Sequence, residues 1–367
     1  MLGEASKLHN MAKENKSIRL VIIVSDYMVA EYSIFLNHLL VGLVDESVPV
    51  ALVCSPSCKV DFIVSPAVEV IRYPAFNLPL LWHWNKKILI EQLEKFRPTI
   101  LHCLCGSKAL LTGQLACHLD LPYVLTVNSL QKRRGWLSIL PKRCAKIIVP
   151  AESIATNIAK FYPQLAERIK QINIGTFVQE DSICFDQSGR LASMVLTHPL
   201  KSVSDFEKLL GAVRHLKIDG YEFMLVLTGG GRAEKRLRKL LVTLDLLHIV
   251  VIVPELEPQR AVVAAGDIFI QPCQNSAFNP LLLEAMSVGA AVAGCEGGVD
   301  DLIIKGQIAV VFDPDDELSI KHCLKQLLDR PEFARKLGRT AQEYLKENHM
   351  VSRMIADILH TYREVRN

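Results

Sequence analysis

The chain has 367 residues, of which half are hydrophobic and 22% are charged. This balance is typical of a folded globular protein and excludes an intrinsically disordered chain, while a net charge of +3 is too small to indicate nucleic-acid binding. Because a domain commonly holds about 100–200 residues, the length predicts two domains.

Residues 1–17 mix both charge signs and lack the apolar core of a secretory signal, so we expect a solvated N-terminal tail. No apolar run in the sequence approaches the roughly 20 residues that a membrane-spanning helix needs. The ten cysteines lack the matching Cys or His pairs of a zinc site, and several lie in apolar runs. We therefore expect reduced cysteines, no bound metal and a cytoplasmic protein.

Short apolar runs alternate with helical patterns between residues 18 and 176. Alternation of this kind predicts parallel strands joined by crossover helices, as in a doubly wound α/β domain. Strands are expected at 19–25, 49–55, 68–73, 99–105, 123–128, 146–151 and 169–175. Helices are expected among them at about 32–44 and 86–96. We therefore assign residues 18–176 to an N-terminal Rossmann-like domain.

A basic stretch, QKRRGWLSILPKRCAK at 131–146, interrupts this first series. Its six basic residues flank Trp136, Leu137, Ile139 and Leu140, a pattern compatible with an amphipathic helix on an anionic membrane surface. The alternative is a solvated basic face over a buried apolar stripe. The first interpretation predicts a weak peripheral contact with anionic membranes, and the second predicts none.

The stretch at 177–190 has no clear period and several turn-forming residues, so we expect an interdomain hinge there. The alternating pattern then begins again and predicts a second doubly wound domain over 191–345. Its strands are expected at 191–197, 222–229, 248–254, 267–272, 290–295 and 309–314, and its helices near 203–217, 232–244, 257–265 and 280–288. The final stretch, 346–367, is helical, and we expect it to pack back on the N-terminal domain.

A glycine cluster, LTGGGRAEKRL at 227–237, follows a predicted strand and precedes a basic helix. Ligands of doubly wound sheets lie beyond the carboxyl ends of the strands, where this cluster falls. Gly229, Gly230 and Gly231 would let backbone N–H groups approach a phosphate, and Arg232 adds positive charge. A tight strand-to-helix turn needs glycine for steric reasons alone, so both explanations stay open.

The run SAFNPLLLEAMSVG at 276–289 carries one charge, Glu284, among apolar residues. Asn279 as N-cap and Pro280 at the first helical position predict a helix over 280–288 that ends before Gly289. Burying an unpaired carboxylate costs roughly several kcal/mol. Glu284 is therefore expected either to face a cleft or to have a partner.

The second half of the chain resembles a known family. The strand ending near 272, the pattern F-x-x-L-L-L-E-A-M-S-x-G-A-A-V-A from Phe278, then G-G-V-D-D-L-I and F-D-P-D-D, resemble the nucleotide-sugar-binding half of the retaining glycosyltransferases of family four. The resemblance covers residues 190–345 and extends more weakly over 18–175. It implies the GT-B fold, in which two Rossmann-like domains face a central cleft, and metal-independent sugar transfer from a UDP- or GDP-sugar, with no separate cofactor.

The resemblance also implies roles for individual residues. The family glutamate at the position of Glu284 binds the ribose hydroxyls of the nucleotide. Lys201 matches a lysine that clamps the diphosphate, and the fold reads the base through backbone groups, here near Pro254 and Glu255. The donor site would be completed by the glycine cluster with Arg232 and by Ser276, Phe278, Asn279 and Leu281.

Several positions of the family pattern are substituted, and all of them concern the phosphates or the sugar. Leu196 stands where an arginine pairs with the lysine, and Ser276 replaces a second glutamate. Asn128 replaces a strand-end histidine, Asn279 follows Phe278 in place of a glycine, and SDYMVAEYS at 25–33 replaces a glycine-rich loop.

The remaining polar residues near the expected cleft include His102, His198 and Lys201. A histidine at the end of a strand can take part in catalysis or can be structural. We take Lys201, Asn128 and His102 as candidate catalytic residues. The acidic turn FDPDDE at 312–317 is interpreted as turn formers and a helix cap rather than as metal ligands.

Two functions from different classes fit these patterns. The first is a retaining glycosyltransferase that acts on an unknown lipid-linked, glycan or small-molecule acceptor. The second is a non-catalytic GT-B relative that serves as a binding or scaffolding module, which the substitutions at Leu196, Ser276 and Asn128 favour. A sugar epimerase is a lesser alternative, as is a phosphorylase, because the expected lysine context for pyridoxal phosphate is not found.

Overall fold

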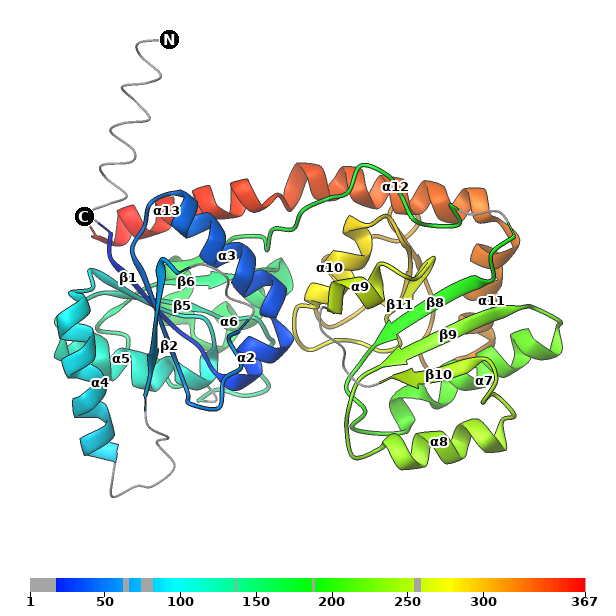
Figure 1. Ribbon diagram of the computed structural model, residues 1–367, viewed down its shortest axis with the longest axis horizontal. Coiled ribbons are helices and arrows are strands. Elements are labelled where there is room, and N and C mark those ends of the chain that lie inside the picture. The colour runs from blue at the N-terminus through cyan, green and yellow to red at the C-terminus, as the bar shows by residue number, and fades with distance from the viewer. Residues whose placement is uncertain are drawn as a thin grey trace, which may run out of the picture. The chain divides into compact units, whose positions relative to one another are not determined.

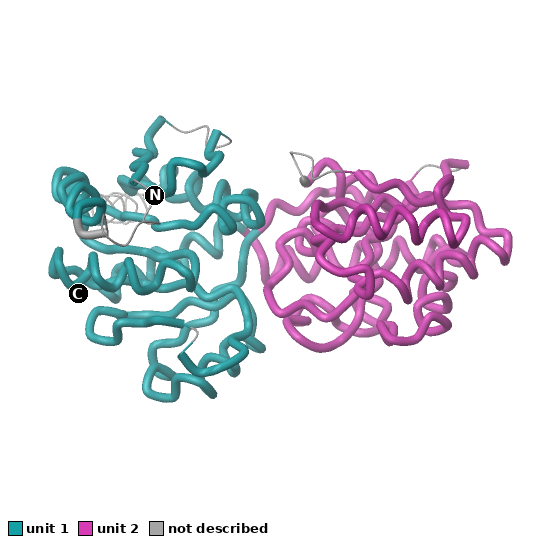
Figure 2. The backbone as a smooth tube through the Cα atoms, turned by 90° about the horizontal axis from the view of Figure 1, so that it is seen from below, with its two compact units in different colours: residues 1–175, 351–367 teal, residues 176–350 magenta. Residues whose placement is uncertain are grey.

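Two units divide the chain in the computed structural model, which describes residues 18–61, 66–73, 82–135, 137–186, 189–253 and 259–366. Unit 1 contains residues 1–175 and 351–367, and unit 2 contains residues 176–350 (Figure 2). The chain passes into unit 2 after Gly175 and returns to unit 1 after Met350.

Unit 1 holds a parallel sheet whose seven strands, within the described residues, run in the order β3-β2-β1-β4-β5-β6-β7. The strands are β1 (Leu20–Ile23), β2 (Val50–Cys54), β3 (Val68–Arg72), β4 (Ile100–Cys103), β5 (Tyr123–Thr126), β6 (Cys144–Val149) and β7 (Ile169–Gln171). The helices are α2 (Asp26–Glu31), α3 (Ser33–Asp45), α4 (Trp82–Phe96), α5 (Ala109–His118), α6 (Glu152–Phe161) and α13 (Val351–Arg366), with short 3-10 helices η2 (Gly106–Lys108) and η3 (Pro163–Arg168). Each strand expected in this part of the sequence is present.

The central strands of unit 1 are apolar along their whole length because helices cover both faces of the sheet. Leu20 of β1 pairs with Val50 on one side and with Ile100 on the other, so the strand order reverses between β1 and β4. Helices α3 and α13 pack closely side by side (Figure 1). A Cβ atom at Gly42 of α3 would lie 2.5 Å from the Ile355 side chain of α13, so a larger residue there would require this side chain to shift.

Unit 2 holds a second parallel sheet, whose order among the described residues is β10-β9-β8-β11-β12-β13. Strands β8 to β11 of this sheet are labelled in Figure 1. Its strands are β8 (Ala192–Thr197), β9 (Phe223–Thr228), β10 (Val250–Val253), β11 (Ile268–Ile270), β12 (Ala291–Gly294) and β13 (Ala309–Val311). Its helices are α7 (Ser204–Ile218), α8 (Glu234–Thr243), α9 (Gln259–Val263), α10 (Pro280–Ser287), α11 (Glu317–Asp329) and α12 (Pro331–Asn348). The prediction of two doubly wound, Rossmann-like α/β domains is confirmed.

Local capping signals behave as the sequence predicts. The Asn279 side chain accepts hydrogen bonds from the Leu281 and Leu282 N–H groups at 3.1 and 3.3 Å, and Pro280 begins α10. Asp316 caps α11 by accepting from the Leu318 N–H at 2.9 Å. The acidic turn before α11 is therefore a turn and a helix cap.

Of the two interpretations of 131–146, the amphipathic helix is not formed by the described residues. Turns and irregular backbone occupy the described residues before β6, which begins at Cys144. Leu137 is buried, whereas Lys132 and Lys142 are exposed. The local reason is the pair of helix breakers, Gly135 with a φ of 85° and Pro141, which interrupt the helical period.

The stretch at 177–190 is hydrogen-bonded to unit 2. The Gln179 N–H donates to the Ser287 carbonyl at 2.9 Å, and the Ile183 N–H donates to the Val288 carbonyl at 3.1 Å. Further along, the Phe185 N–H donates to Asp267 Oδ1 at 2.7 Å. This stretch therefore runs along the end of α10 and the start of β11, and a role as a hinge stays a prediction.

Candidate functional site

The strand order of unit 2 reverses between β8 and β11, which is the point where doubly wound sheets bind ligands at the carboxyl ends of their strands. Three segments leave the sheet at these ends: 198–203 after β8, 229–233 after β9 and 271–279 after β11. They carry the sequence-predicted residues Lys201, Gly229, Gly230, Gly231, Arg232, Ser276, Phe278 and Asn279.

The glycine cluster joins the segment after β9 to the segment after β8. The Leu200 N–H donates to the Gly230 carbonyl at 3.1 Å, and the Ala233 N–H donates to the Leu200 carbonyl at 3.0 Å. A Cβ atom at Gly229 would lie 2.3 Å from the His198 carbonyl oxygen, and one at Gly231 would lie 2.2 Å from that of Leu200. The steric explanation therefore holds for Gly229 and Gly231, while a Cβ at Gly230 would meet open space.

The same junction carries two cationic side chains. Lys201 and Arg232 are both exposed, and Arg232 Nε donates a hydrogen bond to the Lys201 carbonyl at 3.3 Å. Within the described part of the chain, no backbone hydrogen bond uses the Gly230 or Gly231 N–H. Two cations and two available N–H donors at the start of a helix form a surface suited to an anion such as a diphosphate.

His198 connects this junction to the segment after β11. Its Nε2 lies 3.8 Å from Asp205 Oδ2 and 3.7 Å from Cys273 Sγ, and its ring packs edge-on against Phe206. Burial lowers the pKa of His198, although the Asp205 carboxylate opposes this shift. A histidine with a lowered pKa is neutral at pH 7, so it supplies hydrogen bonds rather than charge here.

The positions that the resemblance marks as substituted have different surroundings in the structure. Leu196 is fully buried within β8 and pairs with Leu227 and Ile270, so this position supplies core packing and no charge. Ser276 is exposed, and Phe278 is buried. Asn279 uses the first free N–H groups of α10, including that of Leu281, for its own cap. The Leu281 and Leu282 N–H groups at the start of α10 are therefore already bonded to the Asn279 side chain.

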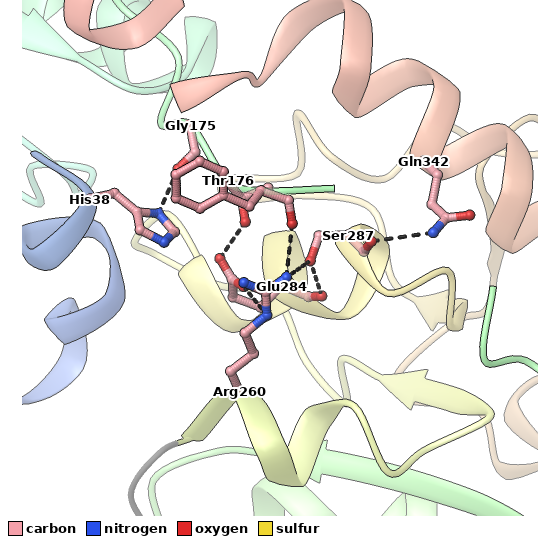
Figure 3. A network of polar contacts seen from close by, with 8 residues as sticks. His38, Gly175, Thr176, Arg260, Glu284, Ser287 and Gln342 are labelled. Carbon is pink, nitrogen blue, oxygen red and sulfur yellow. Dashed lines mark hydrogen bonds and ion pairs between the residues drawn. The ribbon is translucent and has the colours of Figure 1, made fainter. Parts of the chain in front are cut away.

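Glu284, on α10, is held in a polar network (Figure 3). Its Oε1 accepts a hydrogen bond from the Thr176 hydroxyl at 2.6 Å, and its Oε2 lies 3.3 Å from Arg260 Nε on α9. Ser287, one turn further along, donates to the Glu284 carbonyl at 2.8 Å and lies within reach of Arg260 Nη2 at 3.4 Å. The lone charge of this apolar helix therefore has a basic partner.

Burial and two polar partners shift the pKa of Glu284 in opposite directions. The Glu284 side chain is 2% exposed, and burial raises the pKa of Glu284, whereas the Thr176 hydroxyl and the Arg260 guanidinium lower it. The net shift of the Glu284 pKa is upward. Glu284 thus has a partner, as one of the two sequence-based alternatives required, and its position toward a cleft between domains stays a prediction.

His102 is a core residue, contrary to the catalytic role considered for it. It is 1% exposed, its Nδ1 lies 2.6 Å from the Tyr362 hydroxyl, and its Nε2 lies 2.7 Å from Thr126 Oγ1. Burial lowers the pKa of His102 to about 3, so the ring is neutral at pH 7. Both ring nitrogens are used, and the contact with Tyr362 ties α13 to the sheet of unit 1.

Asn128 lies two residues after the end of β5 in unit 1. Its Nδ2 approaches the Leu104 carbonyl at 3.5 Å, and its Oδ1 is buried without a hydrogen-bond partner. It lines a cavity of about 10 Å³ together with Phe35, Ile174 and Met354. That volume is enough for about one water molecule.

Pro254 and Glu255 lie outside the described residues. The SDYMVAEYS stretch contains α2, and the Ser25 hydroxyl caps this helix by accepting a hydrogen bond from the Met28 N–H at 3.2 Å. Sequence reasoning missed Thr176 and Arg260, because nothing local marks them as partners of a glutamate far away in the chain.

No group of three or more His, Cys, Asp or Glu side chains among the described residues is arranged to hold a metal ion. No helix in this part of the chain is both long and apolar enough to cross a membrane. The ten cysteines are free thiols.

Two family models match the chain, one in each half. Residues 33–176 match the family described as Glycosyltransferase Family 4, and residues 194–344 match the family described as Glycosyl transferases group 1. Among curated proteins, the sulfoquinovosyl transferase SQD2 of Arabidopsis thaliana is 33% identical over 84 residues. That match covers 22% of this chain and 16% of the relative.

Solved structures share the fold over nearly the whole chain. A glycosyltransferase from Rickettsia africae has a TM-score of 0.81 at 14% identity and covers 95% of this chain and 98% of its own. HepE from Anabaena, in complex with UDP, has a TM-score of 0.79 at 12% identity and covers 95% of this chain and 100% of its own. Sucrose-phosphate synthase from Thermosynechococcus elongatus has a TM-score of 0.73 at 15% identity and covers 94% and 98% of the two chains.

Proposed function

Because this chain is built from the two matched domains of a GT-B glycosyltransferase, we propose that it transfers a sugar from a nucleotide-sugar donor to an acceptor hydroxyl with retention of anomeric configuration. In this reaction the bond between the anomeric carbon and the diphosphate breaks. The acceptor oxygen takes its place on the same face of the sugar, and the acceptor proton leaves with the diphosphate. The acceptor is a lipid-linked, glycan or small-molecule hydroxyl.

The observation that carries this proposal is the junction of the segments after β8 and β9. It presents Lys201, Arg232 and the Gly230 and Gly231 N–H groups at the carboxyl edge of the sheet, beside the point where the strand order reverses. A leaving diphosphate develops negative charge, and preorganised cations and N–H donors stabilise such charge strongly. Because these groups supply the positive charge, the proposed reaction needs no metal.

Glu284 also supports the proposed binding of a nucleotide-sugar. A buried carboxylate that is kept ionised accepts hydrogen bonds from two hydroxyl donors, which matches the vicinal hydroxyls of a ribose. The solved complex of HepE contains UDP-glucose, so a UDP-sugar is the first donor to test here. We propose UDP-glucose or a related UDP-sugar as the donor, with GDP-sugars as the next class.

The first experiment measures donor hydrolysis, the slow transfer of sugar to water, because it needs no knowledge of the acceptor. Purified full-length protein is incubated with UDP-, GDP-, ADP- and TDP-sugars, and the released sugar is quantified. Lys201→Ala should lower turnover by about 100-fold or more, since loss of one preorganised charge costs roughly 3–4 kcal/mol of transition-state stabilisation. Lys208→Ala is the matched control, because Lys208 is an exposed lysine of the same unit that pairs with Glu317 on α11.

A non-catalytic function is the second candidate, and two observations favour it. Leu196 is buried in β8 where the resemblance calls for an arginine, and the Asn279 side chain uses the N–H groups at the start of α10. Both features remove positive charge or donors from the diphosphate. Saturable nucleotide binding without any donor hydrolysis would support this candidate, whereas turnover that depends on Lys201 would exclude it.

A further inference from the structure

Arg260 has three polar partners near Glu284, the proposed ribose ligand. Its Nε lies 3.3 Å from Glu284 Oε2, and its Nη2 donates to the Phe177 carbonyl at 2.8 Å and approaches Ser287 Oγ at 3.4 Å (Figure 3). The Arg260 side chain is 28% exposed, whereas that of Glu284 is 2% exposed. The planar guanidinium is thus held by three polar partners beside a nearly buried carboxylate, while part of its own side chain stays exposed.

The carboxylate keeps acceptor capacity in this arrangement. Oε1 accepts one hydrogen bond, from Thr176, while Oε2 is buried without an aligned hydrogen bond despite its proximity to Arg260. The 3.3 Å separation is therefore an ion pair rather than a well-directed hydrogen bond. A buried polar atom without a hydrogen bond is uncommon and indicates a site prepared for a donor group.

Among the described residues, one cation, Arg260, lies beside Glu284. Of the described elements, α9, α12 and β12 make the most extensive contacts with α10. Helix α9 contributes Arg260, α12 contributes the neutral Gln342, which binds the Ser287 carbonyl at 3.3 Å, and β12 contributes small apolar side chains. Among the described residues, Arg260 is therefore the charged group that opposes protonation of Glu284.

We propose that Arg260 is a positioning residue of the donor site, whose guanidinium keeps Glu284 ionised and oriented so that the carboxylate accepts the hydroxyls of the donor ribose. Thr176 fixes the other carboxylate oxygen. This inference rests on the proposed function, because it takes Glu284 as a ribose ligand. Arg260 itself touches the carboxylate and not the reacting atoms, so its effect is on donor affinity and on the pH dependence of that affinity.

The test is the pH profile of donor binding by full-length protein, measured by calorimetry between pH 5 and pH 8 with UDP-glucose and with GDP-mannose. These donors carry no terminal phosphate, so they do not take up the proton that phosphomonoesters bind near pH 6. Affinity that depends on ionised Glu284 is present above the pKa of that carboxyl and is lost as the pH falls through it. Removing the cation raises this pKa, so the loss should begin at higher pH.

Arg260→Gln should move the midpoint of this loss upward by about one pH unit or more and should weaken donor binding at pH 7 by about 10-fold or more. Arg260→Lys keeps the charge but not the planar fork, so its midpoint should move in the same direction by less. Glu284→Gln should bind the donor weakly, and the pH dependence that Glu284 causes should be absent. A pH dependence caused by His198 would remain in this variant, so the two groups can be distinguished. The Lys variant carries the test if the Gln variant does not fold.

Arg335→Gln is the matched control. Arg335 is 26% exposed, pairs with Glu332 and donates to the Cys184 and Phe185 carbonyls, so it copies the burial and contact types of Arg260 elsewhere in unit 2. If the Arg260 variants and Arg335→Gln have the same pH profile of donor binding, the inference about Arg260 is wrong. The proposed function would not be affected by that result. If the unmodified protein binds neither donor, the proposed function fails and this inference fails with it.

Discussion

Replacing Gly231 by alanine tests the junction on which the proposed diphosphate site depends. The new Cβ atom would lie 2.2 Å from the Leu200 carbonyl oxygen, and because real Cβ atoms do not come closer than 3.0 Å, the two segments must separate by nearly an ångström. That movement weakens the hydrogen bonds from Leu200 N–H to Gly230 and from Ala233 N–H to Leu200, now 3.1 and 3.0 Å long.

The expected cost follows from these two effects. Overpacking of this kind costs roughly 1–3 kcal/mol, and each weakened hydrogen bond adds up to about 1 kcal/mol. We therefore expect Gly231→Ala to lower the free energy of unfolding by about 2–4 kcal/mol. For a unit of this size, that corresponds to a fall in Tm of about 5–10 °C.

The assay is thermal unfolding followed by circular dichroism without ligand. Gly230→Ala is the matched control, because it makes the same chemical change at the adjacent residue, where a Cβ would meet nothing within 4 Å. It should change the unfolding free energy by less than about 0.5 kcal/mol. Equal Tm values for the two variants would refute the close approach of the two segments.

Three further predictions concern other parts of the molecule. His102→Gln should reduce the loss of unfolding free energy at acid pH. The folded-state pKa of His102 is about 3 against an ordinary 6.5, so the contribution of its neutral ring to the free energy of unfolding is present above pH 6.5. This contribution is lost as the pH falls toward 3, by roughly 4–5 kcal/mol in full. Urea unfolding at pH 7.5 and pH 4.5 measures this, and equal pH slopes for both proteins would contradict it. Leu196→Arg should destabilise the protein by about 3–5 kcal/mol without raising donor turnover, because it buries a charge inside β8; a folded variant with higher turnover would contradict this. The exposed basic residues predict weak co-sedimentation with anionic vesicles at low salt that is reduced in a Lys132→Glu, Lys142→Glu variant, and equal binding to neutral vesicles would exclude an electrostatic contact.

The strands and their order along the chain could be predicted from the sequence alone. Every predicted strand is present, because apolar runs of β-branched residues bounded by turn formers report burial on both faces of a parallel sheet. The Asn279-Pro280 start of α10 and the Asp316 cap of α11 were also predictable. Such caps depend on atoms two or three residues apart, so they are written in the local sequence.

The side chains that meet across the fold could not be predicted from the sequence. Glu284 is paired with Thr176 and Arg260, which lie 108 and 24 residues away, and His102 is paired with Tyr362, 260 residues away. No local pattern specifies such partners, because the strand order and the helix packing bring them together. The amphipathic helix, one of the two interpretations of 131–146, is absent for a related reason. Charge and apolar spacing were compatible with a helix, but the turn at Gly135 and the pairing of β6 in the sheet determine the backbone of the described residues. Periodicity reports which face of a segment is buried, and the fold alone decides what that face is buried against.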